Sequence, residues 1–342
     1  MPNRDVIVVG ASAGGVEALR ELAAGLPPDF PGTVLVVLHL PPTGWSALPL
    51  ILDRAGPLSA KQAEDGDRLE PGRILVAAPN KHLVVYDGRV TLSNGPRENG
   101  HRPAVDVLFR TAARVLGPRV VGVILSGALD DGMAGMVAVQ LRGGATVVQS
   151  PDEALHASMP RSAMTMVEVQ HVLPVAKIPP LLAELASEEV SADPGGSSDL
   201  MTTEAAMADL DPDAINRPER PGKPAGLSCP DCNGTLYEIE EGGLLRYRCR
   251  VGHAWSPASL VAQQGTALEG ALWMALRTLE EKAALTSDLA HQATAAGHTL
   301  SGKTFERESQ EALKAAGLVR DLIGEITGGS GDRPVADSAK GG

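Results

Sequence analysis

The chain has 342 residues, 43% of them hydrophobic, and a formal net charge of −12. This length exceeds the usual domain size of roughly 100–200 residues and predicts two folded units, while the acidic balance disfavours broad binding to nucleic acid or anionic membranes. No apolar run approaches the ~20 residues that span a bilayer, and the start of the chain lacks the features of a signal peptide, so we expect a cytoplasmic location.

The N-terminal segment joins a buried-strand pattern to a small-residue turn. The apolar run 6–9 leads into Gly10, Ala11, Ser12, Ala13, Gly14 and Gly15, and apolar residues at helical spacing follow. This order predicts a strand that turns sharply into a helix, with Ser12 at the positive end of the helix. Ser12 is therefore a candidate nucleophile, with a plain tight turn as the alternative. The segment lacks the middle glycine of GxGxxG and the P-loop lysine, which disfavours nucleotide binding.

Two further apolar runs each end in a residue that suits a serine nucleophile. The run Thr33 to Leu38 ends at His39, and the run Val120 to Leu125 is followed within a few residues by Asp130 and Asp131. Because the carboxyl ends of parallel strands share one edge, we expect Ser12, His39 and one of these acids to meet. This combination is the nucleophile, base and orienting carboxylate of a serine hydrolase. The alternatives are a structural histidine and aspartates that cap the next helix.

These segments together resemble the catalytic domain of the CheB protein-glutamate methylesterases. The matching stretches, over about residues 4–188, are Val9 to Gly15, the strand ending at His39, Ala78 to His82, Arg102 to Phe109, Ser126 to Gly135 and Met159 to Ala163. The resemblance implies a doubly wound, mostly parallel α/β domain with Ser12 as nucleophile, His39 as general base and Asp131 as the residue that orients His39. It implies hydrolysis of glutamate methyl esters on a chemoreceptor, with glutamine deamidation as a related activity and no catalytic cofactor.

Other residues near these motifs are candidates for the substrate pocket. The peptide N–H groups around Ala13 and Ala128 are candidates for the oxyanion site, and Met159 is a pocket candidate whose role we expect to be packing. We expect His82 and His101 to be incidental loop residues. The chain has Ala13 where the family usually has a hydroxyl residue. The resemblance therefore indicates the class of reaction more firmly than the identity of the substrate.

The chemotaxis enzymes usually carry a receiver domain ahead of the esterase domain, whereas here the first strand begins near Asp5. We therefore expect no attached receiver, with control by a partner or by the rest of the chain. Residues 189–226 are rich in Ser, Gly, Pro, Asp and Glu, and we expect them to be a disordered linker.

All three cysteines lie in the next segment, residues 227–256. Cys229, Cys232, Cys249 and His253 have C-x2-C and C-x3-H spacing, which predicts a structural zinc site in a zinc ribbon. A disulfide between two of the three cysteines would leave the third unpaired. A redox Cys-x2-Cys pair would leave Cys249 and His253 without a role.

The ribbon hairpin has two alternating strands, Leu236 to Glu241 and Leu244 to Arg250, around Gly242 and Gly243. One face carries Arg246, Arg248 and Arg250. We expect these arginines to pair across the strands with Glu238 and Glu240, the alternative being a surface for nucleic acid or an acidic partner.

Apolar residues at helical spacing then predict an antiparallel helical hairpin over 257–327, which packs on itself, on a second copy of the chain or on a helical partner. Residues 328–342 are expected to be disordered. A ribbon and helical tail after such an esterase half resemble a known subgroup of the family.

The sequence thus predicts a methylesterase domain, 1–188, tethered to a ribbon and a helical hairpin. The substrate is a methylated receptor or another signalling protein. The alternative function is a non-catalytic scaffold that binds such a receptor and recruits partners through the ribbon and the helices.

Overall fold

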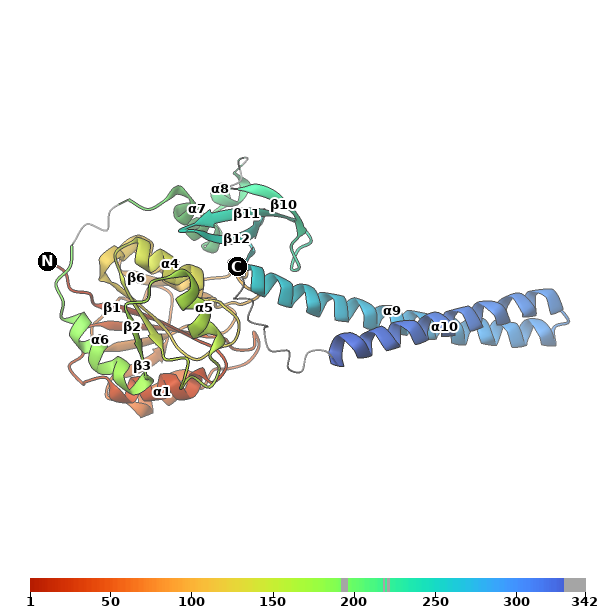
Figure 1. The fold of residues 1–342 in the computed structure, drawn as a ribbon, viewed down its shortest axis with the longest axis horizontal. Coiled ribbons are helices and arrows are strands. Elements are labelled where there is room, and N and C mark those ends of the chain that lie inside the picture. The colour runs from red at the N-terminus through yellow and green to blue at the C-terminus, as the bar shows by residue number, and fades with distance from the viewer. Residues whose placement is uncertain (192–195, 218, 220–221, 329–342) are drawn as a thin grey trace, which may run out of the picture. The chain divides into compact units, whose positions relative to one another are not determined.

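The computed structural model describes residues 1–191, 196–217, 219 and 222–328 (Figure 1). The chain divides into two compact units, residues 1–261 and 262–342. No helix among the described residues is long and apolar enough to cross a membrane.

Parallel strands form the centre of the first unit. Within the described residues the sheet has seven strands in the order β3-β4-β2-β1-β7-β8-β9, and each neighbouring pair is parallel. Their bounds are β1 Val6–Ala11, β2 Thr33–Leu38, β3 Ser59–Gln62, β4 Arg73–Val76, β7 Val120–Ile124, β8 Ala145–Gln149 and β9 His171–Leu173. A separate antiparallel pair consists of β5 His82–Tyr86 and β6 Arg89–Ser93.

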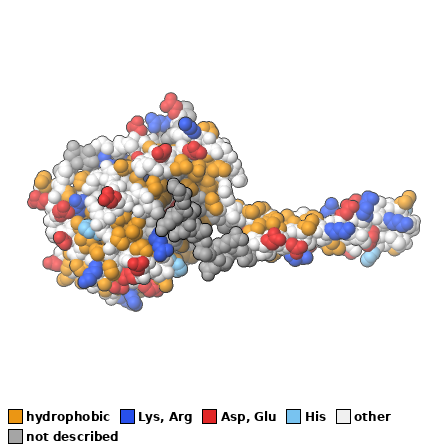
Figure 2. Space-filling model, in the orientation of Figure 1, with side chains coloured by type: hydrophobic (Ala, Val, Ile, Leu, Met, Phe, Trp, Pro, Cys, Tyr) orange, Lys and Arg blue, Asp and Glu red, His pale blue; other side chains and the backbone are white. Residues whose placement is uncertain are grey.

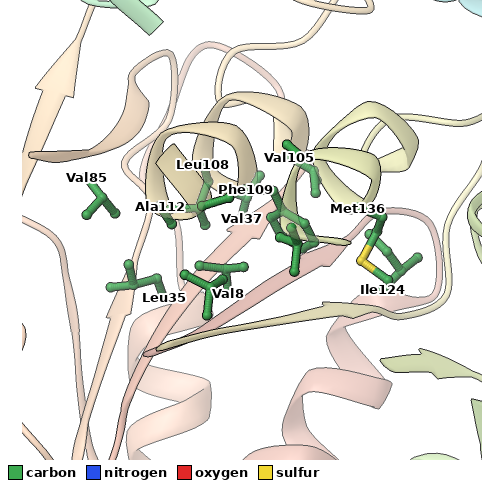
Figure 3. Close-up of a cluster of buried hydrophobic side chains, with 14 of the residues drawn as sticks. Val8, Leu35, Val37, Val85, Val105, Leu108, Phe109, Ala112, Ile124 and Met136 are labelled. Atoms are coloured by element: carbon green, nitrogen blue, oxygen red, sulfur yellow. The ribbon is translucent and has the colours of Figure 1, made fainter. Parts of the chain in front are cut away.

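Helices cover both faces of this sheet because successive strand residues point to opposite sides. Ile7 and Val9 of β1 pack with α1 Gly15–Gly25, α2 Leu48–Ala55 and α6 Ile178–Ala186. Val8 points the other way, where it packs in one cluster with α3 Val105–Leu116, α4 Met133–Leu141 and α5 Ser158–Met166 (Figure 3). The short helices η1 Gly117–Arg119 and η2 Val175–Lys177 complete the connections. The predicted doubly wound α/β fold is confirmed, and the carboxyl ends of β1, β2 and β7 lie at one edge.

The described residues of the predicted disordered linker form two helices and the start of a strand, so this part of the prediction is wrong. Residues 189–226 contain α7 Asp199–Ala208, α8 Pro212–Asn216 and the start of β10 Lys223–Ser228. The Ser198 side chain caps α7 by accepting a hydrogen bond from the N–H of Met201 at 3.0 Å. Met201 and Met207 are buried, Ser93 donates to the Ala208 carbonyl at 2.6 Å, and the Glu204 carboxylate is fully enclosed. The overall polar composition of the segment concealed this short apolar face.

The ribbon belongs to the same compact unit as the parallel sheet. It is a four-stranded antiparallel sheet of β10, β11 Thr235–Glu241, β12 Leu244–Cys249 and β13 Ala254–Trp255. Trp255, Leu236 and Leu260 form its small core with Cys229 and Cys249. The ribbon is therefore packed onto the esterase-like domain rather than tethered to it.

Arg246 and Arg248 of the ribbon are buried whereas Arg250 is exposed, and the expected cross-strand pairing is wrong. The register places Arg246 opposite Ile239 and Arg248 opposite Tyr237. Glu238 and Glu240 lie opposite Tyr247 and Leu245 instead.

Arg246 and Arg248 instead bind Glu204 of α7, with the closest atoms 2.8 Å apart, and Arg248 also reaches Glu98 at 2.8 Å. Arg110 of α3 pairs with Glu98 at 2.6 Å. Burial raises the pKa of Glu204, but the surrounding arginines outweigh it and hold this pKa well below its usual range. Because these charges are enclosed, Arg246 and Arg248 are not available to nucleic acid.

The second unit is a helical hairpin of α9 Pro257–Ala295, which begins in the first unit, and α10 Thr299–Gly328. Leu276, Ala316 and Ile323 form its buried core, and Ser309 donates to the Ala283 carbonyl at 2.8 Å. Acidic and basic side chains are intermixed with apolar ones on its visible face (Figure 2). Apart from Gly328, the tail predicted to be disordered lies outside the described residues.

The buried arginines predict a large difference between two neighbouring substitutions. Arg248→Met leaves the carboxylates of Glu98 and Glu204 short of a buried partner, and we expect it to lower the free energy of unfolding by about 3–5 kcal/mol. Arg250→Met, at an exposed position directly after β12, is the matched control, with an expected change within about 0.5 kcal/mol. Urea unfolding measures both. Equal effects of the two substitutions contradict this account.

Candidate active site

Ser12 lies where β1 ends and α1 begins. Its N–H donates to the Ser126 carbonyl at 3.0 Å, and its own carbonyl accepts from the Gly15 N–H at 2.9 Å. Gly14, with a φ of 68°, precedes the first residue of α1 in a left-handed conformation that favours glycine. A Cβ on Gly127 would lie 3.0 Å from the Ser12 Cβ and 2.1 Å from the Met159 sulfur. Glycine at position 127 therefore leaves the space in which Ser12 sits.

His39 joins Ser12 to Asp131. It directly follows β2, and its N–H donates to the Ala11 carbonyl at 3.2 Å. Its Nε2–H donates to Asp131 Oδ2 at 2.7 Å, and its Nδ1 accepts from the Ser12 hydroxyl at 3.2 Å. The structure thus brings the three sequence-predicted residues into one hydrogen-bonded chain.

The Asp131 carboxylate is buried at the N-terminus of α3. Its Oδ2 also accepts from the Val105 N–H at 2.7 Å, and its Oδ1 accepts from the Asp106 N–H at 3.2 Å and from Asn99 Nδ2 at 3.0 Å. Burial raises the pKa of Asp131, but the hydrogen bond and charge of His39 and the Val105 N–H outweigh it and hold this pKa far below its usual range. Asp131 therefore stays ionised without access to water.

The side chains of Asp130 and Asp131 do not cap α4, the helix that follows them in the chain. Asp106 of α3 caps α4, because its Oδ1 accepts from the N–H groups of Gly132 and Gly135 at 3.0 and 2.7 Å, whereas Asp131 accepts from two N–H groups in the first turn of α3. Asp130 accepts from the Ser256 hydroxyl at 2.8 Å, at the start of α9.

The two histidines expected to be incidental are both integral to the site region. The His101 ring stacks on His39, with ring centroids 3.6 Å apart and an interplanar angle of 10°. His82 is completely buried, donating from Nε2 to the Pro96 carbonyl at 2.9 Å and accepting from the Ala104 N–H at 3.2 Å. The expectation was wrong because loop residues next to a sheet edge can be enclosed by neighbouring loops.

Asn99 is a further residue of the site that the sequence interpretation missed. Asn99 and Gly100 have φ values of 52° and 79°, and Glu98 and His101 exchange both backbone hydrogen bonds across them at 3.2 and 2.9 Å. Asn-Gly is a strong signal for such a tight turn, so the turn was readable from the sequence. Its contact with Asp131 depends on tertiary packing.

The three pocket candidates occupy different environments. Ala13 is half-buried and its carbonyl accepts from the Ser126 hydroxyl at 2.8 Å, while Ala128 is exposed. Met159 is buried, and its N–H donates to the Gly127 carbonyl at 3.0 Å.

The ribbon brings together the four sequence-predicted metal ligands. The ligand atoms of Cys229, Cys232, Cys249 and His253 all lie within 4.8 Å of one another. The sulfurs of Cys232 and Cys249 are 3.6 Å apart, and the Cys249 sulfur is 3.5 Å from His253 Nδ1. Tetrahedral zinc with Zn–S bonds of about 2.3 Å places its sulfurs about 3.8 Å apart, so this donor set fits the ion.

Comparisons with known proteins agree with the geometry of the first domain. Residues 7–182 match the family model described as CheB methylesterase. A protein-glutamate methylesterase/protein-glutamine glutaminase of Anaeromyxobacter dehalogenans is 43% identical over 184 residues, which cover 53% of this chain and 51% of that protein. An Enterobacter cloacae protein of the same name is 35% identical over 196 residues, covering 56% of this chain and 55% of that protein.

The crystal structure of the Thermotoga maritima CheB methylesterase catalytic domain matches with a TM-score of 0.51 and 34% identity, covering 53% of this chain and 98% of that one. The chain spans about half the length of the curated relatives named above. The ribbon and the helical hairpin lie outside the residues that match the family model.

The stacked histidines predict a specific dependence of stability on pH. Burial, followed by the charge of His39, lowers the pKa of His101 from 6.5 to about 4, so His101 is neutral in the folded protein. Between these values the unfolded chain binds more protons, and the free energy of unfolding falls as the pH falls. At pH 4 this contribution is a loss of about 3 kcal/mol relative to pH 7.

We expect His101→Phe, which keeps an aromatic ring against His39, to remove this part of the loss. His82, whose pKa burial also lowers to about 4, keeps its own contribution. Urea unfolding at pH 7 and pH 4 measures the difference. An equal loss in the variant and the unaltered protein contradicts the prediction.

Proposed function

Because the chain belongs to the CheB methylesterase family, we propose that it hydrolyses glutamate methyl esters on a chemoreceptor-like or other signalling protein, with deamidation of glutamine as a related activity. The single observation that carries the proposal is the hydrogen-bonded chain from Ser12 through His39 to the buried Asp131. The printed names of the relatives, which pair a methylesterase with a glutaminase activity, support the choice of substrate.

In the proposed reaction Ser12 is the nucleophile and His39 the general base. The Nε2–H of His39 is held by Asp131, which leaves Nδ1 as the unprotonated nitrogen facing the Ser12 hydroxyl. As the Ser12 oxygen bonds to the ester carbonyl carbon, its proton passes to Nδ1. The resulting imidazolium is stabilised by the Asp131 carboxylate, which stays ionised.

The same imidazole completes both halves of the reaction. It returns the proton to the methoxide leaving group, so methanol departs and an acyl-enzyme on Ser12 remains. A water molecule then gives a proton to Nδ1 as its oxygen bonds to the acyl carbon. When the bond between that carbon and the Ser12 oxygen breaks, Nδ1 passes this proton to the Ser12 oxygen, so the glutamate carboxyl group is released and Ser12 and His39 are restored. For a glutamine substrate the leaving group is ammonia.

We place the oxyanion site near the peptide N–H groups of Ala13 and Ala128. Ala13 lies between Ser12 and the start of α1, where the helix dipole favours negative charge. Ala128 follows Gly127, whose ideal Cβ position is close to Ser12. The buried Met159 side chain packs against Gly127, which is the packing role expected for it.

Substitution of Ser12 tests the proposed reaction. We expect Ser12→Ala to lower kcat for a methylated receptor peptide by at least about 10³-fold and to abolish labelling by a fluorophosphonate, because no nucleophilic oxygen remains. Ser187→Ala, on the exposed end of α6, is the control and keeps both activity and labelling. Methanol release and mass spectrometry of the labelled protein are the measurements. A loss of less than tenfold overturns Ser12 as the nucleophile.

We further propose that Cys229, Cys232, Cys249 and His253 hold a structural zinc ion with every coordination position filled by protein. The spacing of the donors supports this, as does the Trp255 Nε1–H that donates to the Cys229 sulfur at 3.4 Å. Such an ion stabilises the ribbon and takes no part in ester hydrolysis.

Metal analysis tests the zinc proposal. We expect about one zinc per chain in the purified protein, and strong chelators to lower the unfolding temperature because metal binding is coupled to folding of the ribbon. Cys249→Ser should lose the metal, whereas Asp231→Asn, which removes a carboxylate 3.9 Å from His253 without removing a proposed ligand, should retain it. Protein that folds fully with no bound metal contradicts the proposal.

A further inference from the structure

The turn of residues 98–101 is shared between the catalytic site and the ribbon. Its Asn99 N–H donates to the Ala254 carbonyl of β13 at 2.8 Å, and the Ala254 N–H donates to the Arg97 carbonyl at 3.3 Å. Glu98 binds Arg248 of β12 at 2.8 Å. On its other side the turn presents Asn99 to Asp131 and His101 to His39. The ribbon therefore contacts the same short segment that touches the proposed base and its orienting acid.

The Asn99 side chain connects these two sides directly. Its Nδ2 donates to Asp131 at 3.0 Å and to Asp106 at 2.9 Å, and its Oδ1 accepts from the Ser256 N–H and from the Ser259 hydroxyl, each at 2.9 Å. Two donors on Oδ1 fix which end of the amide faces the carboxylates. A rotated amide would direct its oxygen at two carboxyl groups and its NH2 at the Ser256 N–H, which is itself a donor.

Ser256 and Ser259 are placed by the start of α9. Ser256 directly precedes Pro257, the first residue of the helix, and its hydroxyl accepts from the Ser259 N–H at 3.0 Å. The Ser259 hydroxyl accepts in return from the Ser256 N–H at 3.0 Å and also donates to Asn99. Both serines are buried, as is Asn99.

We propose that Ser259, together with the Ser256 N–H, positions the esterase through Asn99, so that the junction of ribbon and α9 holds the Asp131 carboxylate in its working orientation. The inference rests on the proposed function and extends it, because it makes catalysis depend on residues beyond the part of the chain that matches the family model. Ser259 is a positioning residue that does not touch substrate.

A purely structural role for Ser259 predicts a different outcome. As part of the helix cap, Ser259 contributes to stability whether or not Asn99 is present. As a positioning residue it affects catalysis only through Asn99, so its effect disappears when the Asn99 side chain is absent. A double-mutant cycle between the two positions separates these roles.

The experiment compares Ser259→Ala, Asn99→Gly and the double variant in the full chain. Glycine is chosen at position 99 because it keeps the positive φ while removing the amide. We expect Ser259→Ala to lower kcat about fivefold, with KM changed less than twofold, and to have no further effect in the Asn99→Gly background. Ser309→Ala, which removes another buried hydroxyl that donates to a helix carbonyl, is the matched control and leaves kcat unchanged.

A second readout separates this inference from the proposed function. Amide hydrogen exchange should increase in residues 98–106 in Ser259→Ala and stay unchanged there in Ser309→Ala, because Asp131 holds the N–H groups of Val105 and Asp106. If the unaltered protein hydrolyses no methyl ester, the proposed function fails and increased exchange alone still supports the coupling. The positioning role of Ser259 is overturned if amide exchange in residues 98–106 is unchanged in Ser259→Ala. It is also overturned if Ser259→Ala lowers kcat equally with and without the Asn99 side chain.

Discussion

The arrangement of the site depends on a buried negative charge. Asp131 is removed from water, and an ionised carboxylate is stable there only if hydrogen-bond donors surround it. The first turn of α3, the Asn99 amide and the His39 ring supply these donors. Because one of them is His39 Nε2–H, the condition that keeps Asp131 ionised also fixes the imidazole with its other nitrogen toward Ser12.

A second group of enclosed charges joins the ribbon to the parallel-sheet domain. Glu98 and Glu204 are neutralised by three arginines, of which Arg110 lies on α3 and the other two lie on the ribbon strand β12. Glu98 is the neighbour of Asn99 in the tight turn, so the same loop is held by ion pairs on one side and by the catalytic acid on the other. The ribbon and α7 thus belong to the structural support of the site, although neither belongs to the part of the chain matched by the family model.

The sequence predicted the parts of this protein that depend on local pattern. The strands β1 and β2 form over the predicted apolar runs and end directly before Ser12 and His39, and the ligand spacing around Cys229 and Cys249 brings the four donors together. The errors concern partners far apart in the chain: Arg248 binds residues 44 and 150 positions away rather than its cross-strand neighbours. Polar composition concealed α7 for the same reason, since the buried Glu204 is stabilised by arginines of α3 and of the folded ribbon, which are distant from it in the chain.

The central claim is that Asp131 holds His39 in the tautomer that leaves Nδ1 free for Ser12. Nitrogen-15 NMR of the His39 ring at pH 8 tests it directly, because the two ring nitrogens have different shifts when protonated and unprotonated. The account predicts a proton on Nε2 and an unprotonated Nδ1, with this preference lost in Asp131→Asn. A proton on Nδ1, or a preference that survives the loss of the Asp131 carboxylate, would contradict it.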